Sequence, residues 1–168
     1  MKKALLMAFT LTVISASASF AQGRWSLGGE LAFPQGNFNN GYGAGIGVSG
    51  RYEGVINKNL DWMVTLGYIH FFEKNNSNFS AYQVPLNGGL KYYVDSSFKG
   101  FWFGGELGLN VIGWRWNNPG PGDDVNDSET RLGLAPQIGY HISNVDFSLR
   151  YHIIDDASYL GFRVAYVF

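Results

Sequence analysis

The sequence predicts an all-β protein: an eight-stranded antiparallel up-and-down transmembrane β-barrel, preceded by a cleaved signal peptide. Three observations favour this fold class. Of the 168 residues, 17% are aromatic, only 15% are charged and 23 are glycine, whereas a soluble domain carries about 25% charged residues and about 7% glycine. Eight segments alternate between apolar and other residues with a period of two, which is typical of two-faced strands. In all eight segments the charges avoid the apolar face.

Composition also excludes several classes of protein. The formal net charge of −1 lacks the broad positive field of a nucleic-acid binder, so no nucleic-acid partner is expected. The absence of cysteine excludes disulfides, thiolate metal sites and a cysteine-anchored lipoprotein. The length predicts one domain.

Residues 1–21 have the three parts of a secretory signal peptide. Lys2 and Lys3 form the positive start, 4–14 are apolar, and 15–21 are rich in small residues. The apolar stretch is too short to cross a hydrocarbon core of about 30 Å as a helix. We expect cleavage after Ala21, which leaves 22–168 as the barrel domain; the alternative is an uncleaved helix that packs on the domain.

The eight predicted strands are 24–34, 42–53, 61–71, 81–94, 100–112, 130–142, 145–153 and 159–168. Their apolar faces begin in that order with Trp25, Tyr42, Trp62, Tyr82, Phe101, Leu132, Val145 and Leu160, and continue at every second position. Clusters of Gly, Pro, Asn, Asp and Ser separate the segments, as expected of turns between strands.

The charged residues of the strands all lie on the opposite face: Arg24, Glu30, Arg51, Glu53, Asp61, Lys91, Glu106, Arg131, Asp146, Arg150 and Arg163. A lipid-facing Lys or Arg at the bilayer midplane costs roughly 2–4 kcal/mol. A water-soluble eight-stranded barrel would show the reverse pattern, with charges outside and apolar residues inside. The placement of charge therefore favours a membrane barrel over the soluble alternative.

The connections predict the orientation of the barrel. The segments 54–60, 95–99 and 143–144 are short, whereas 35–41, 72–80, 113–129 and 154–158 are the other four connections, three of them long and polar. In outer-membrane barrels short turns face the periplasm, so we expect periplasmic termini and extracellular long loops in a Gram-negative outer membrane. Aromatic girdles are predicted at one rim from Trp25, Tyr52, Trp62, Tyr92, Phe101 and Phe168, and at the other from Phe33, Tyr42, Tyr68, Tyr82 and Tyr151.

With this signal peptide, these strands and a terminal Phe168 after alternating apolar residues, the chain resembles the small OmpA/OmpX-type outer-membrane barrels, also described as porin-family β-barrel domains. The resemblance implies that Val164, Tyr166 and Phe168 are read by the barrel-assembly machinery; alternatively, Phe168 only anchors the last strand in the interface. We expect no periplasmic domain after Phe168. A barrel satisfies its own backbone hydrogen bonds, so a monomer is expected.

The inward face predicts a filled lumen. Glu30, Glu106, Arg150 and Arg163 lie near the middle of their strands, and the first strand must pair with the eighth. Because buried charges must be paired, we expect a salt-bridge cluster that plugs the lumen. It acts as a static polar core, or alternatively as a gate in a narrow ion path. Inward Gly43, Gly45 and Gly47 are expected to make room for Trp102 or Tyr93.

Candidate chemistry is sparse, and no cofactor is expected. His70, His141 and His152 lie on three strands without the spacing of a metal site. The resemblance includes lipid A deacylases, which use a His-x-Ser pair near the top of a strand. Here Ile154 stands at the serine position after His152, and Ser158 follows four residues later. We therefore expect no enzyme, with lipid A modification as an alternative.

The segment 113–129 is the strongest predicted binding element. It contains Trp114, Arg115 and Trp116, followed by a Pro/Gly stretch and an acidic run. Exposed aromatic residues beside Arg are enriched at binding surfaces, although tryptophans at this height also anchor barrels among lipid headgroups. The sequence thus predicts an integral outer-membrane barrel with a structural or surface-binding role, whose partners include outer-membrane lipid and lipopolysaccharide.

Overall fold

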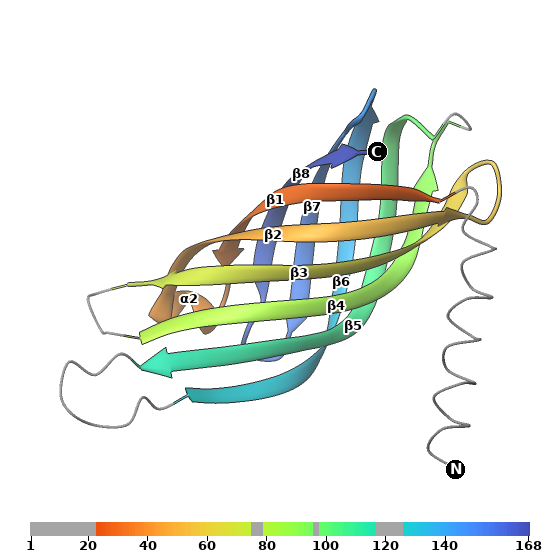
Figure 1. The fold of residues 1–168 in the computed structure, drawn as a ribbon. Helices are drawn as coiled ribbons and strands as arrows, with labels where there is room; N and C mark the ends of the chain where they lie inside the picture. Colours follow the sequence, from red (N-terminus) through yellow and green to blue (C-terminus); the bar gives the residue numbers. More distant parts are fainter. Residues whose placement is uncertain (1–22, 75–78, 96–97, 117–125) are drawn as a thin grey trace, which may run out of the picture.

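The computed structural model describes residues 23–74, 79–95, 98–116 and 126–168. They form a closed barrel in which every strand pairs antiparallel with its neighbours in sequence and β8 pairs with β1 (Figure 1). The strands are β1 (Arg24–Pro34), β2 (Tyr42–Val55), β3 (Leu60–Glu73), β4 (Phe79–Tyr93), β5 (Gly100–Trp116), β6 (Asn126–Ile142), β7 (Val145–Ile154) and β8 (Tyr159–Val167), with a short helix α2 (Phe38–Gly41). The predicted fold class is confirmed; the predicted signal peptide lies outside the described residues.

The largest difference from the predicted strands is in β5 and β6. Both continue beyond their predicted ends, and their ladder reaches the pair Arg115 and Asn126. Trp114, Arg115 and Trp116 are therefore strand residues, and their placement in a loop was wrong. The turn signals of 117–122 do not reach back to Trp114, because Trp114 continues the inward alternation of Glu106, Asn110 and Ile112.

The connections fall at two ends of the barrel (Figure 1). We call the end where β1 begins and β8 ends the short-turn end; it carries the connections 56–59, 94–99 and 143–144. The other end, the long-loop end, carries 35–41, 74–78, 117–125 and 155–158. At the long-loop end α2 lies in the connection between β1 and β2.

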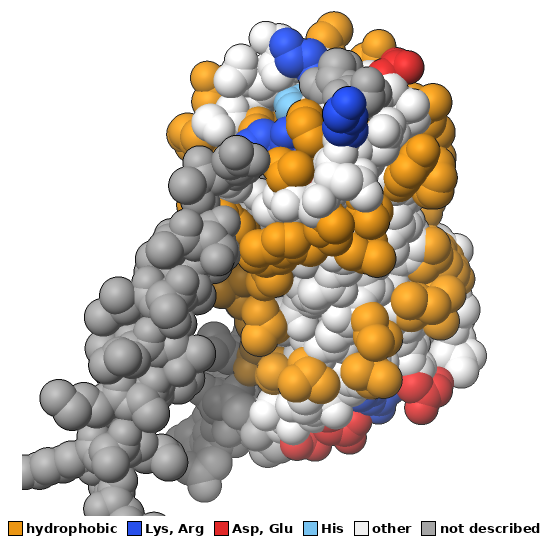
Figure 2. Space-filling view, turned by 90° about the vertical axis from the view of Figure 1, so that its right-hand side faces the viewer, with side chains coloured by type: hydrophobic (Ala, Val, Ile, Leu, Met, Phe, Trp, Pro, Cys, Tyr) orange, Lys and Arg blue, Asp and Glu red, His pale blue; other side chains and the backbone are white. Residues whose placement is uncertain are grey.

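The outer face is apolar between charged ends. Figure 2 shows hydrophobic side chains on the side of the barrel that faces the viewer, with Lys, Arg, Asp and Glu gathered at its two ends. Leu132 and Leu27 on this face are 64% and 60% exposed, whereas Arg51 and Arg163 inside the barrel are 0% exposed. Burial is thus the reverse of that in a soluble domain, as the alternation predicted.

Among the described residues, no helix is both long enough and apolar enough to cross a membrane.

Candidate functional site

The four residues of the predicted lumen cluster meet at the centre of the barrel. Arg150 Nη2 lies 2.5 Å from Glu30 Oε2, and Arg150 Nη1 lies 3.7 Å from Glu106 Oε2. Arg163 Nε lies 4.0 Å from Glu30 Oε1. Glu30 and Arg163 are direct partners in the ladder that closes β1 on β8. Closure of the sheet therefore brings together residues that lie at opposite ends of the chain.

Arg163 is held mainly by hydroxyl groups. Its Nε–H donates to Ser49 Oγ at 2.8 Å, and its Nη2–H donates to Ser26 Oγ at 3.0 Å. Ser26 and Ser49 project inward from β1 and β2 and are themselves buried. The arrangement satisfies several donors of a guanidinium that is fully removed from solvent, as a buried charge requires.

Arg51 also belongs to this central layer, although the sequence prediction did not include it. Its Nη2 lies 3.3 Å from Glu106 Oε1 and donates to Gln137 Oε1 at 3.0 Å. Its Nε–H donates to Thr65 Oγ1 at 3.0 Å, and the Thr65 hydroxyl donates to Glu106 Oε1 at 2.5 Å. Arg51 lies on the inward face of its strand, like the other four residues. The prediction covers only residues near the middle of their strands, whereas Arg51 lies near the end of the predicted strand 42–53.

A second charged layer fills the short-turn end. Lys91 Nζ lies 2.8 Å from both Glu53 Oε1 and Asp146 Oδ2. The indole N–H of Trp102 donates to the same Asp146 oxygen at 3.0 Å. Arg24 closes the layer with ion pairs to Asp61 and Glu53.

The two layers balance each other in charge. The central layer holds Arg51, Arg150, Arg163, Glu30 and Glu106, and the short-turn layer holds Arg24, Lys91, Glu53, Asp61 and Asp146. The first has one more cation than anion and the second one more anion than cation. Arg51 Nη1, 3.9 Å from Glu53 Oε1, joins them.

The lumen at the long-loop end is mainly apolar, with Gln83 and Asn110 hydrogen-bonded to each other at 2.9 Å beside the apolar residues. A cluster that we call the apolar cap consists of Ala32, Phe38, Ile69, Phe71, Ala81, Ile112, Ile154, Ala157 and Tyr159, with Tyr42 and Trp114 packed against it. The ring of Phe38, carried by α2, lies 4.9 Å edge-on from that of Phe71. A connecting segment thus supplies part of the core that closes this end.

Trp114 therefore has a different position from either interpretation of the sequence. It is partly buried inside the barrel against the apolar cap, and it is neither on a free loop nor facing lipid. Its neighbours Arg115 and Trp116 are placed in β5 by their backbone.

The inward glycines of β2 make room for residues other than those expected. A Cβ on Gly45 would approach the Phe71 ring to 2.8 Å, and one on Gly47 would approach the Ile69 side chain to 2.8 Å. Trp102 instead fits against Gly139, where a Cβ would lie 2.4 Å from its indole. The expectation was wrong because the register of β2 on β3 decides which inward side chains face the glycines.

The residues of the enzymatic alternative are not arranged as a nucleophile and its base. The Ser158 hydroxyl donates to the Ile154 carbonyl at 2.9 Å and accepts the Ile154 N–H at 3.2 Å. The buried ring of His152 stacks on Tyr159 at 4.2 Å. No grouping of three His, Asp or Glu suited to a metal ion occurs in the described part of the chain.

Val164 and Tyr166 of the predicted assembly signal lie on the outer face of β8, and Phe168 follows directly after the strand. Val164, Tyr166 and Phe168 are 39%, 52% and 73% exposed. The Tyr166 and Phe168 rings contact edge-on at 5.2 Å, and the Phe168 N–H donates to the Trp25 carbonyl at 2.8 Å.

Several solved structures share this architecture, and natural membrane barrels are among them. Ail, the attachment invasion locus protein of Yersinia pestis, has a TM-score of 0.65 and 16% identity over 87% of this chain and 97% of its own. The N-terminal barrel domain of Pseudomonas aeruginosa OprF has a TM-score of 0.54 and 11% identity over 88% and 100%. Neisserial surface protein A has a TM-score of 0.51 and 14% identity over 86% and 94%.

This chain has the fold of the small outer-membrane β-barrels. At these identities the likeness is one of architecture, and it agrees with the OmpA/OmpX-type resemblance seen in the strand pattern. No protein-family model matches the sequence, and a comparison with curated proteins finds no relative.

Proposed function

We propose that this chain is an integral, monomeric outer-membrane protein with a structural or surface-binding role and a lumen closed to solutes. The observation that carries the proposal is the filling of the lumen by two charged layers below an apolar cap. Barrels of eight strands have an interior just wide enough for side chains, so this filling leaves no wide path.

The charged layers support closure because they tie opposite walls together. Arg150 on β7 reaches Glu30 on β1 and Glu106 on β5, while Arg51 on β2 reaches Glu106 as well. Removing one partner of a buried pair costs about 3–5 kcal/mol. An ion would have to displace these contacts and then cross the apolar cap, and hydrophobic constrictions oppose the passage of ions.

The outer face supports insertion into a bilayer. Its exposed side chains are apolar along the strands. Near the short-turn end the Tyr52 ring contacts Trp25 on one side and Trp62 on the other, with ring centroids 4.8 and 5.3 Å apart. Aromatic rings at this height are typical of a membrane interface. We infer periplasmic termini, extracellular long loops and recognition of Val164, Tyr166 and Phe168 by the assembly machinery.

The long-loop end is the proposed binding surface. Ail has been solved in complex with the heparin analogue sucrose octasulfate, so a barrel of this architecture presents a surface for ligands. In this chain the rim near β6 and β7 carries Glu129, Asp155 and Asp156 around Arg131, which pairs with Glu129 at 2.7 Å. The acidic groups of this part of the rim repel sulfated sugars, so we expect the partner that contacts β6 and β7 to be neutral or cationic.

Conductance across a planar bilayer tests the closed lumen. We expect the full-length wild-type chain to insert without steady conductance. A narrow channel would conduct, and its conductance would change with Glu106→Gln or Arg150→Ala.

Mass spectrometry of lipid A from cells with and without the protein tests the proposed lack of catalysis. Loss of one acyl chain that depends on His152 would overturn it.

A further inference from the structure

Polar side chains interrupt the apolar outer face where β3 and β4 approach the long-loop end. His70 and Ser80 lie on this face, each two residues from a girdle tyrosine, Tyr68 on β3 and Tyr82 on β4. His70 is the direct ladder partner of Tyr82. A polar pair on a lipid-facing surface is costly unless it meets a polar partner.

The four side chains line an open hollow of about 290 Å³ on the outer surface. The rings of Tyr68 and Tyr82 stack across the two strands at 6.0 Å with an interplanar angle of 18°. The His70 ring is held edge-on against Phe72 at 5.3 Å. These ring contacts fix the walls of the hollow before any ligand arrives, which lowers the entropy lost on binding.

The hollow lies below the rim of the barrel. Phe72 lies two residues beyond His70 on the same outward face and is 47% exposed. An apolar ring thus separates the hollow from the end of β3, while Leu66 and Val64 continue the lipid-facing surface on the other side. A bilayer positioned on this belt therefore places its boundary between headgroups and acyl chains at His70 and Ser80.

The polar atoms of the hollow are available to a ligand. Within the described part of the chain, no side-chain hydrogen bond joins His70, Ser80, Tyr68 or Tyr82 to another protein group. Three hydroxyls and one imidazole can donate to phosphate oxygens or exchange hydrogen bonds with sugar hydroxyls. The tyrosine rings add apolar surface beside them.

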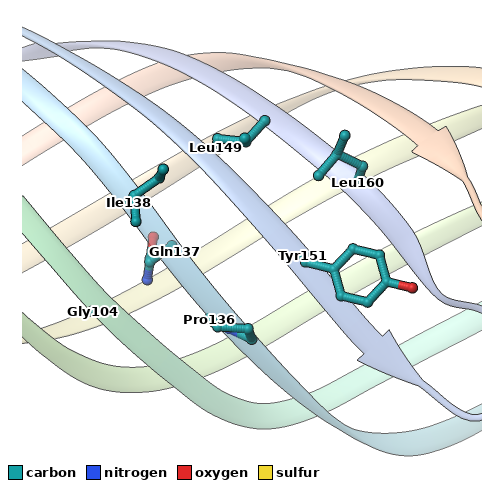
Figure 3. A pocket seen from close by; sticks show the side chains of 7 residues that line it. All are labelled: Gly104, Pro136, Gln137, Ile138, Leu149, Tyr151 and Leu160. Atoms are coloured by element: carbon teal, nitrogen blue, oxygen red, sulfur yellow. The ribbon is translucent and has the colours of Figure 1, made fainter.

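A second hollow on the barrel wall has a more apolar lining and serves for comparison. It measures about 260 Å³ and is lined by Gly104, Pro136, Gln137, Ile138, Leu149, Tyr151 and Leu160 (Figure 3). Its outer face is lined by aliphatic Ile138, Leu149 and Leu160, which suit acyl chains, and Tyr151 supplies a single hydroxyl at its edge. The β3–β4 hollow is similar in size but offers four hydrogen-bonding side chains, which suit a polar headgroup better than an acyl chain.

We propose that the hollow formed by Tyr68, His70, Ser80 and Tyr82 binds the phosphorylated sugar headgroup of an outer-leaflet glycolipid. The volume is at the lower end of ligand sites and suits one sugar ring with its phosphate. This inference rests on the proposed outer-membrane location and names a lipid partner for it.

The test compares lipid retention by the full chain and its variants. The protein is reconstituted in phosphatidylcholine vesicles containing lipid A and phosphatidylglycerol, and the lipids bound after mild extraction are counted by native mass spectrometry. We expect the wild-type protein to retain more lipid A than phosphatidylglycerol. His70→Leu with Ser80→Ala removes two hydrogen-bonding groups and should weaken lipid A retention about tenfold. Lipid A stripped of phosphate should bind more weakly to wild type.

Tyr151→Phe is the matched control, because it removes a girdle hydroxyl beside the apolar hollow. It should leave lipid A retention unchanged, while Tyr82→Phe should reduce it. Equal retention of both lipids by wild type, or wild-type retention by the double variant, would overturn the site. A loss of lipid A retention in Tyr151→Phe equal to that in Tyr82→Phe would also overturn the site. Circular dichroism and insertion into the vesicles report on fold and location separately, so a failed site and a failed outer-membrane assignment are distinguishable.

Discussion

The two ends of the lumen are filled in opposite ways. Toward the short-turn end ten charged side chains pair across the barrel, whereas the long-loop end is closed by aliphatic and aromatic residues of the apolar cap. Both fillings are buried, but ion pairs depend on their partners and on geometry, while apolar packing depends on volume. One barrel interior therefore holds together by two kinds of interaction, which respond differently to mutation.

The largest effect is expected in the central charged layer. Arg150→Met leaves Glu30 without the guanidinium at 2.5 Å and Glu106 without one of its two arginines. We expect the free energy of unfolding to fall by about 3–5 kcal/mol, measured by urea titration of the barrel refolded in vesicles. Adding Glu30→Gln should restore part of the loss. The cost of Glu30→Gln is also measured in the wild-type background. If Glu30→Gln lowers the free energy of unfolding by the same amount with and without Arg150→Met, the two residues are not coupled.

The apolar cap should respond to volume instead. Ile112→Ala removes a fully buried side chain and should lower the free energy of unfolding by about 2–5 kcal/mol. The volume-conserving control Ile112→Leu should cost less than about 1.5 kcal/mol. Comparable losses for both variants in the same titration would mean that shape rather than volume governs this end.

A smaller effect separates the two faces of the wall. A Cβ on Gly104 would lie 2.3 Å from the Leu90 carbonyl oxygen, whereas one on Gly105 would meet only the Ala135 carbonyl oxygen at 4.0 Å. Gly104→Ala should therefore cost about 1–3 kcal/mol and Gly105→Ala less than about 0.5 kcal/mol. The melting temperatures of the two variants, compared in one detergent, check this, and equal shifts would contradict it.

The smallest effect is expected for an ion pair outside the lumen. Arg131 and Glu129 approach to 2.7 Å at the long-loop rim, but their side chains are 23% and 51% exposed. Arg131→Gln should change the free energy of unfolding by about 0–1 kcal/mol, and less at high salt. A loss as large as that of Arg150→Met would show that burial is not what distinguishes the lumen pairs.

Much of the charged filling was predictable, because a period of two assigns each side chain to a face. Glu30 and Arg163 had to be neighbours once the first strand paired with the last. The apolar cap was harder to predict, because Ile69, Ile112 and Ile154 lie on the inward face at strand ends where polar residues were expected. Phe38 comes from a connecting segment, whose fold the alternation does not encode.

The sequence by itself determined the eight strands, the face of each side chain and the closure of β1 on β8, because alternation and turn signals are local properties of the chain. Only the tertiary structure decided which inward residues meet across the lumen, such as Arg51 with Glu106, and which glycine accommodates Trp102. Those contacts depend on strand tilt and on the offset between strands, which closure of the whole barrel fixes. No single segment carries that information.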